Sequence, residues 1–253
     1  MKNILIVAFV ALLSCSCANK KEILYVQDAE SYNNSVINFS VPIIQPNDIL
    51  KITVGTLEPE AAIPYNRPTG DNARSVNLEV MQLDGYIVTK DHTINFPQLG
   101  TVSTKGITCQ ELQELLKKML EDGGHLVNPT VNVRLLNAKV TVLGEVNRPG
   151  TYNFTEQNMT LLQALGYAGD LTINGKREDI LVIREADSLR QISHIDLTSA
   201  KLMETPFYNI RPNDVIIVNP NEPKVKSAGF VGNTGTLISV ISILLSTIVL
   251  ITR

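Results

Sequence analysis

The sequence predicts an α+β protein with two small mixed α/β domains followed by a C-terminal transmembrane helix, and three observations lead to this prediction. Short segments rich in β-branched residues alternate with two segments whose apolar residues recur at helical spacing. Clusters of Pro, Gly, Asn and Asp separate these segments, as expected for turns. Near the end of the chain, 26 consecutive residues carry no charge, and their centre is rich in Leu, Ile and Val. A chain of 253 residues is long enough for two such domains and additional segments.

Composition and spacing argue against nucleic-acid binding and against an enzyme. The chain has 22 basic and 25 acidic residues and a net charge of −3, whereas nucleic-acid binding needs a clustered basic surface. His92, His125 and His194 are far apart in the sequence, and no pair has the spacing of a helical zinc site. We find no nucleophile with a nearby base and no phosphate-binding glycine loop. The sequence therefore predicts no catalytic residues, no metal and no cofactor.

The first 14 residues have the features of a secretory signal peptide, with a basic start and a short apolar run. This run is too short to span a bilayer as a helix. It ends in cysteine and so is similar to the lipobox of bacterial lipoproteins. Cys15 fits this pattern best, because Leu12 lies three residues before it. Cys17 is the alternative, and an ordinary cleaved signal with incidental cysteines is also open. A diacylglyceryl group on the thiol, with a further fatty acyl chain such as palmitate, would anchor the protein stably to a membrane.

Residues 15–41 are polar and predict a lipidated tether, within which residues 25–28 could dock as a short strand. Residues 42–137 predict the first domain, which begins with a turn at 45–48 and a strand at 49–54. A capping box of Thr108 and Glu111 begins an amphipathic helix that stops at Gly123. The other expected elements are a loop at 56–76 and strands at 76–88, 93–96 and 130–136.

Cys109 is the only cysteine in the body of the chain, so no internal disulfide framework is expected. It lies in the first turn of the predicted helix, where the helix dipole could lower the pKa of its thiol. No base is identifiable nearby in the sequence, and a buried or idle thiol is therefore the favoured interpretation.

Residues 138–220 predict the second domain, and its first feature is a strand that runs from 140 to 146 into a turn. Gly144 within this strand indicates a bulge or a close approach of another backbone segment. Pro149 presets φ for the turn, and Gly150 can take a positive φ beside it. A helix that Thr160 caps, and strands at 180–184 and 215–218, follow. Four further residues could hold a polar ligand, although a solvated rim is the simpler interpretation: Arg177, Glu178, Asp179 and Arg184.

Residues 221–253 predict a linker and the transmembrane helix. Small polar residues recur in this helix at a spacing of three to four, which places them on one stripe, with Ile, Leu and Val opposite. The stripe either packs against another helix or lines the centre of a ring of copies. In the second case the pore-lining candidates are Thr236, Ser239, Ser242 and Ser246.

The order of these segments resembles the Wza-like outer-membrane polysaccharide export lipoproteins, whose export domain precedes an SLBB (soluble-ligand-binding β-grasp) domain. Residues 42–136 resemble the export domain in the segments IQPNDILKITV at 44–54, HTINFPQLGTV at 92–102, ELQELLKKMLED at 111–122 and NPTVNVRLL at 128–136. Residues 138–220 resemble the SLBB domain in GEVNRPGTY at 144–152, TLLQALGYAGDLT at 160–172, ILVIRE at 180–185 and PNDVIIVNP at 212–220. The residues of the SLBB motif with an expected structural role are Gly144, Arg148, Pro149 and Gly150.

The resemblance implies a lipid-anchored protein of the bacterial outer membrane with its main body in the periplasm. It implies a homo-oligomeric ring, an octamer in Wza-like proteins, whose C-terminal helices form a barrel through the membrane. This ring would passively conduct capsular polysaccharide or exopolysaccharide to the cell surface. The implied partner is an inner-membrane polysaccharide co-polymerase with a cytoplasmic tyrosine kinase. A second function stays open, that of a lipid-anchored periplasmic scaffold or glycan-binding module without a pore.

Overall fold

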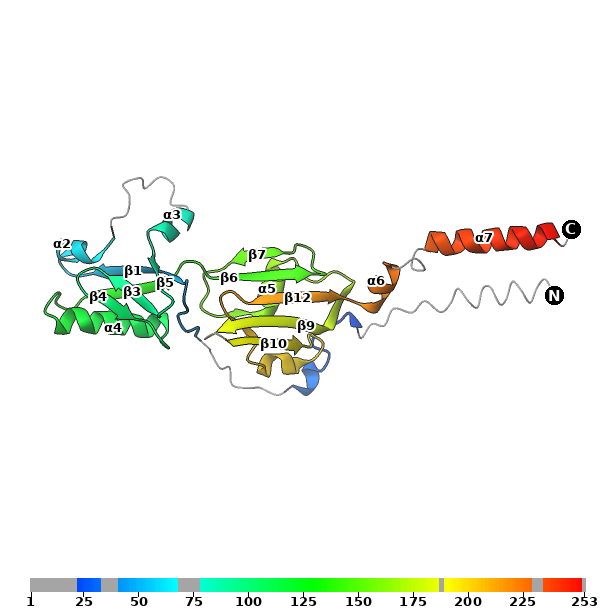
Figure 1. Ribbon diagram of the computed structural model, residues 1–253. Helices are drawn as coiled ribbons and strands as arrows, with labels where there is room; N and C mark the ends of the chain where they lie inside the picture. The colour runs from blue at the N-terminus through cyan, green and yellow to red at the C-terminus, as the bar shows by residue number, and fades with distance from the viewer. Residues whose placement is uncertain (1–21, 33–40, 68–77, 187–188, 229–233, 252–253) are drawn as a thin grey trace.

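A computed structural model gives the structure of the protein and describes residues 22–32, 41–67, 78–186, 189–228 and 234–251. Figure 1 shows two units side by side, each built on a sheet, with helix α7 (Thr234–Ile251) beyond the second unit. We call the unit that contains residues 41–136 the first domain and the unit that contains residues 138–220 the second domain.

The first domain is an antiparallel sheet with one long helix, α4 (Cys109–Asp122), packed against its inner face. The strand order is β2-β1-β5, formed by Tyr86–Ile87, Ile49–Gly55 and Thr130–Leu135, and a hairpin of β3 (Thr93–Phe96) and β4 (Gly100–Ser103) lies beside it. Alternate residues of β1 point inward, as a strand with one buried face requires. The buried side chains that β1 and α4 contribute to the shared core are Leu50, Ile52, Val54, Leu112, Leu116 and Leu120.

The start of α4 confirms the predicted capping box. The Thr108 hydroxyl accepts a hydrogen bond from the Glu111 amide at 3.2 Å, and the Glu111 carboxylate accepts one from the Thr108 amide at 2.7 Å. Two backbone donors that the first helical turn leaves without partners are satisfied in this way. The same arrangement recurs at the start of α5 (Leu161–Tyr167), where Thr160 and Gln163 take the two roles.

Two predictions in the first domain are wrong in detail. The stretch predicted as a loop contains the short helices α2 (Pro59–Ala62) and η3 (Ile63–Tyr65), while residues 68–77 lie outside the described residues. The stretch predicted as a strand from 76 to 88 contains helix α3 (Leu78–Leu83) and only the two-residue strand β2. Leu, Glu, Met and Gln are good helix formers, so local preference outweighed the apolar pattern that suggested a strand.

The second domain is a five-stranded mixed sheet in the order β10-β9-β12-β6-β7. The strands are Leu189–Ile195, Gly175–Ala186, Val215–Pro220, Lys139–Gly144 and Gly150–Asn153. Only the central pair β12 and β6 is parallel, and the other neighbours are antiparallel. Helix α5 lies against one face of this sheet, together with the small pair β8 (Met159–Thr160) and β11 (Asn209–Ile210) and the turn η4 (Ala200–Glu204).

A turn of the same sequence, Pro-Asn-Asp, begins a central strand in each domain. Asn47 and Asn213 both have φ of 70°, a conformation that asparagine tolerates better than most residues. The Asp48 carboxylate accepts a hydrogen bond at 2.8 Å from the amide three residues earlier, and the Asp214 carboxylate does the same at 2.8 Å. Both aspartates are buried, so the turn places a carboxylate inside each domain.

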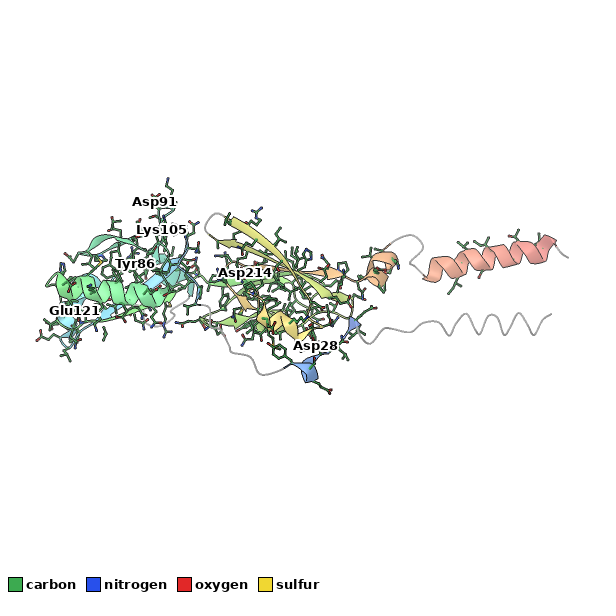
Figure 2. The ribbon with its side chains drawn as sticks, turned by 90° about the horizontal axis from the view of Figure 1, so that it is seen from below. Asp28, Tyr86, Asp91, Lys105, Glu121 and Asp214 are labelled. Carbon is green, nitrogen blue, oxygen red and sulfur yellow. The ribbon has the colours of Figure 1, made fainter. Side chains whose placement is uncertain are left out.

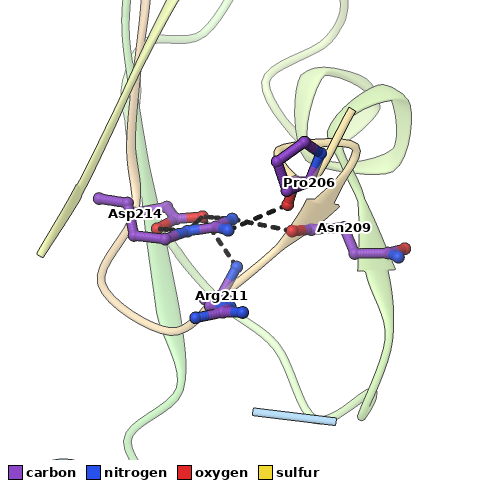
Figure 3. A network of polar contacts seen from close by, with 5 residues as sticks. Pro206, Asn209, Arg211 and Asp214 are labelled. Atoms are coloured by element: carbon purple, nitrogen blue, oxygen red, sulfur yellow. Dashed lines mark hydrogen bonds and ion pairs between the residues drawn. The ribbon is translucent and has the colours of Figure 1, made fainter. Parts of the chain in front are cut away.

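The two buried carboxylates differ in their surroundings. Asp214 forms a bidentate salt bridge with Arg184 of β9, with Nε–Oδ1 at 3.0 Å and Nη2–Oδ2 at 2.7 Å. The same guanidinium donates to the carbonyls of Pro206 and Asn209 at 3.0 and 2.8 Å, as Figure 3 shows for this network. Asp48 has no ion pair within the part of the chain that the structure describes. Arg184 therefore ties β9 to the β11–β12 connection and is not available to a ligand.

The predicted C-terminal transmembrane helix is wrong, and with it this part of the predicted fold class. The protein is mixed α/β, and no helix among the described residues has both the length and the apolarity needed to cross a bilayer. Helix α7 follows the short helix α6 (Glu222–Ser227) and has 18 residues. At about 1.5 Å per residue it extends roughly 27 Å, which is shorter than a hydrocarbon core of about 30 Å.

Candidate functional site

The turn after β6 is fastened to the rest of the second domain, because Gly144 allows β12 to come very close. Gly144 has φ of +89°, and a Cβ at this position would lie 2.0 Å from the carbonyl oxygen of Val218. The next amide, that of Glu145, donates to this same oxygen at 2.9 Å. A side chain at residue 144 would therefore separate the parallel pair β6–β12, in agreement with the close backbone approach that the sequence predicted.

The turn itself is held at the end of α5. The Arg148 amide donates to the carbonyl of Ala168 at 2.8 Å, and the Asn147 amide donates to that of Asp170 at 3.0 Å. Gly150 does not have the positive φ that the sequence suggested, because it is already the first residue of β7 and pairs with Val142. The turn and the end of α5 thus lie side by side and form one continuous surface of the second domain.

A groove of about 860 Å³ lies between the two domains. Its first wall is the outer face of the first sheet, where Lys51 and Arg134 are direct cross-strand neighbours. Its second wall is the loop after β7, with Phe154 and Glu156. Like charges directly opposite on a sheet repel, and neither cation has an ion pair within the described residues. The groove is therefore lined by apolar side chains together with polar ones, and its two cations have no ion pair among the described residues.

Two residues that line this groove, Asp48 and Cys109, have raised pKa values, so their surroundings favour the protonated, neutral forms. Burial raises the pKa of Asp48 to about 6, and the amide of Gln45 opposes this rise by donating to the carboxylate. Burial, and then the charge of Asp48, raises the pKa of the Cys109 thiol to about 11. The thiol therefore stays protonated near neutral pH, which fits a partly buried, unreactive cysteine and not one activated by the helix dipole.

The segment at residues 25–28 docks on the second domain far along the chain, although it is not a regular strand. The amides of Val26 and Gln27 donate to the carbonyls of residues 197 and 198 at 3.0 and 2.7 Å. The Asp28 carboxylate accepts from the Ala200 amide at 2.5 Å and from the Ser199 hydroxyl at 2.7 Å, and these two bonds lower its pKa. Figure 2 shows Asp28 beside the second domain, whereas Glu121 lies in the first.

The four charged residues proposed as a polar ligand site do not converge. Arg184 belongs to the buried network described above. Arg177 is also buried, and its guanidinium donates to the carbonyls of Thr172 and Gly175 and lies 5.4 Å from the centre of the Tyr25 ring. Asp179 pairs with Lys176 and His194, and Glu178 is exposed. The charged residues therefore stabilise β9 and its neighbours. Because alternate residues of a strand share a face, Arg184 lies on the same buried face of β9 as Val182 and Ile180.

The remaining predicted site residues lie at the two ends of the chain. Cys15 and Cys17 lie outside the described residues, as does the side chain of Thr236. The Ser239 and Ser246 hydroxyls each donate to the carbonyl four residues earlier at 2.8 Å, and Ser239, Ser242 and Ser246 are exposed on α7. Their assignment to a pore stays a prediction. Among the described residues, no group of three or more His, Cys, Asp or Glu could hold a metal ion.

Comparison with known proteins gives two consecutive domain matches. A family model described as polysaccharide biosynthesis/export protein matches residues 40–136, and an SLBB domain model matches residues 139–192. The chain is 27% identical over 189 residues to the EPS I polysaccharide export outer membrane protein EpsA of Ralstonia solanacearum, which is 71% of this chain and 48% of that protein. It is 30% identical over 154 residues to the protein of the same name from Ralstonia nicotianae, which is 56% of this chain and 38% of that protein.

The chain spans about half the length, or less, of these two curated relatives. The two domain matches follow one another without overlap. The first covers the sheet of the first domain, and the second covers β6, β7 and β9 and the start of β10 in the second domain. The chain therefore belongs to the Wza-like polysaccharide biosynthesis/export proteins, in which an export domain is followed by an SLBB domain.

Proposed function

We propose that the protein is a subunit of an outer-membrane polysaccharide exporter, a lipoprotein whose copies form a ring that conducts capsular polysaccharide or exopolysaccharide from the periplasm to the cell surface. The observation that carries this proposal is the succession of an export domain and an SLBB domain in one chain. The relatives named as outer membrane export proteins support the location and the cargo. The transport is passive, not enzymatic, and its energy comes from a partner.

A ring is supported by the edges of the second sheet. Strand β10 forms one edge, where Leu189 and Ile192 are exposed, and β7 forms the other. An edge strand leaves backbone N–H and C=O groups without a partner strand, which favours pairing with another chain. Two different surfaces that meet head to tail generate a closed ring when the rotation between copies closes. The two edges of this sheet are such a pair of surfaces.

The lipid anchor would hold the second domain close to the membrane. If Cys15 carries the lipid, Tyr25 follows it ten positions later, and the Tyr25 hydroxyl donates to Asp170 of the second domain. Ten residues reach at most about 35 Å when fully extended. The first domain would then extend into the periplasm, toward an inner-membrane polysaccharide co-polymerase with a tyrosine kinase, which is the proposed partner.

The first test is the shape of the full-length protein extracted from membranes in mild detergent, seen in electron-microscopy class averages. We expect closed rings, and we expect Ile192→Lys to break them into smaller species because it places a charge on the β10 edge. Leu57→Lys, at an exposed apolar position of the first domain, is the matched control. Monomers of the unsubstituted protein in several mild detergents would contradict the ring and favour the alternative, a lipid-anchored scaffold or glycan-binding module without a pore.

A further inference from the structure

A second hollow, of about 390 Å³, lies on the second domain and adjoins the groove between the domains. Six residues line it: Arg148, Glu156, Met159, Gln163, Gly166 and Tyr167. Glu156 lines the groove as well, so the two concave surfaces meet at this side chain. The volume is in the range of sites that bind small ligands.

One side of the hollow is formed by an aromatic ring that its neighbours hold in a fixed position. Tyr167 stacks on Tyr152 with ring centroids 6.2 Å apart and an angle of 25° between the planes. The Tyr167 hydroxyl donates to the Glu156 carboxylate at 3.1 Å, and the Tyr152 hydroxyl donates to the Arg148 carbonyl. Tyr167 is nevertheless 41% exposed, and it forms part of the hollow's surface. A ring that is already fixed loses little conformational entropy when a ligand covers it.

The polar groups around this ring still have bonding capacity. Arg148 donates to the Tyr167 carbonyl at 3.4 Å and has no ion pair within the described residues. Gln163 uses its amide oxygen to cap α5, at 2.8 Å from the Thr160 amide, and its NH₂ group has no partner there. Glu156 supplies the acceptor. Donors and an acceptor thus surround an apolar ring face, which suits a ligand that has both hydroxyl groups and C–H faces.

The charges and the shape select among ligand classes. A bare anion would meet the Glu156 carboxylate. A purely apolar ligand would cover the remaining donors of Arg148 and Gln163 and the remaining acceptor capacity of Glu156 without bonding to them, which is costly. The hollow also has free space above α5, because a Cβ at Gly166 would have no atom within 4 Å. A pyranose ring is uncharged, carries hydroxyl groups around an apolar C–H face, and is small enough for this space, so it fits the hollow.

We propose that this hollow binds one pyranose unit of a polysaccharide, with the sugar ring against Tyr167 and its hydroxyl groups bonded to Glu156, Gln163 and Arg148. The inference rests on the proposed function, since it takes the exported polymer as the ligand. In a ring, each copy would contribute one weak contact along the path of the polymer. Contacts that guide a moving substrate must be weak enough to release it.

The test uses the full-length protein in mild detergent and saturation-transfer difference NMR. The probe is a set of oligosaccharides of about six to ten units, prepared by mild acid hydrolysis of the surface polysaccharide of the producing strain. Gly166→Leu fills the hollow, whereas Gly166→Ala adds one methyl group in open space and is the matched control. Neither is expected to weaken α5, because both residues favour helices more than glycine does.

We expect saturation transfer to the sugar protons in the unsubstituted protein and in Gly166→Ala, and its loss in Gly166→Leu. Tyr167→Ala should weaken binding roughly tenfold, the value of one aromatic contact, while Tyr167→Phe keeps the ring and should bind within about twofold. Binding that is unchanged in both Gly166→Leu and Tyr167→Ala would overturn the inference.

Two further outcomes separate this inference from the proposed function. Rings in the electron microscope without any saturation transfer would overturn the saccharide site and leave the exporter proposal intact. Saturation transfer that Gly166→Leu abolishes, in a protein that stays monomeric, would support the site and contradict the ring. A change in subunit number caused by Gly166→Leu with binding retained would show that the hollow is a contact between copies, and would also overturn the inference.

Discussion

The two Pro-Asn-Asp turns allow one prediction to be controlled within a single chain. Asp214 and Asp48 occupy the same position in the same turn, and each accepts a hydrogen bond at 2.8 Å from the backbone. They differ in that Arg184 pairs with Asp214, whereas Asp48 is buried without a cation among the described residues. We expect aspartate-to-asparagine substitutions at these two positions to change stability in opposite directions.

Asp214→Asn leaves the Arg184 charge buried without its counter-ion. Removing one partner of a buried ion pair costs roughly 3–5 kcal/mol. Arg184 retains its bonds to the carbonyls of Pro206 and Asn209, at 3.0 and 2.8 Å, so we expect a loss of free energy of unfolding of about 3 kcal/mol, near the lower limit.

Asp48→Asn removes a carboxylate whose burial raises its pKa from 3.8 to about 6. A rise of about two units corresponds to roughly 3 kcal/mol of destabilisation once the group is ionised. This cost is fully present above the folded-state pKa, decreases as the pH falls from 6 to 3.8, and is absent below both pKa values. At pH 7 the asparagine variant should therefore be more stable than the unsubstituted protein, by up to about 3 kcal/mol. The gain should disappear near pH 4.

The assay is urea unfolding of the full-length protein in detergent at pH 7 and at pH 4.5, followed by far-ultraviolet circular dichroism. Hydrogen exchange measured by mass spectrometry assigns each change to its domain, since Asp48 reports on the first and Asp214 on the second. Two results would refute the reasoning. One is a loss of stability of similar size in both variants at pH 7. The other is a gain for Asp48→Asn that does not depend on pH.

Three further predictions concern single positions. Gly144→Ala should lower the melting temperature of the second domain strongly, because the new Cβ would lie 2.0 Å from the Val218 carbonyl oxygen at a φ of +89°. Gly150→Ala, where the nearest atom is 3.8 Å away, is the control and should change the melting temperature little. Equal effects of the two substitutions would contradict this prediction. Asp28→Ala should speed hydrogen exchange at the amides of residues 26 and 27, because it removes the carboxylate that bonds to Ala200. In the unsubstituted protein the exchange should become equally fast only in acid, as the pH falls through the lowered pKa of Asp28. Unchanged exchange in the variant would show that the backbone hydrogen bonds alone hold this segment on the second domain. Cys109 should react with iodoacetamide at pH 8 far more slowly than free cysteine does, because its pKa is raised to about 11, and rapid alkylation in the folded protein would contradict the burial.

The sequence predicted best those features whose cause is local. The capping box at Thr108 depends on residues three positions apart, and it is present in the structure. The close approach at Gly144 was likewise predicted from one glycine in a strand, although the identity of its neighbour, Val218, was not. The stretch from 76 to 88 was assigned to the wrong element, because an apolar run of that length suits either a strand or a helix.

Features that depend on distant residues could not be predicted. Arg184 follows the buried face of its strand, so its burial could have been inferred from spacing, but its partner lies 30 residues away in a turn. The hollow around Tyr167 is formed by α5, the turn at Arg148 and the loop at Glu156, which no short sequence segment reveals. The assignment of the tail to a transmembrane helix relied on an uncharged stretch of 26 residues, whereas the helix has 18 residues in the part of the tail that the structure describes.

The docked segment at residues 25–28 changes how the chain is connected as a mechanical object. In sequence order the first domain lies between this segment and the second domain, yet the Asp28 bond to Ala200 joins positions 172 residues apart. The first domain is thus inserted between two segments of the chain that are in contact in the second domain. A pull applied near the start of the chain would load the contacts of Asp28 and then the strands of the second domain, while the first domain would stay outside the path of the force. Because this contact closes so long a loop, we expect it to form late in folding. Once it opens under load, the force passes through the first domain as well.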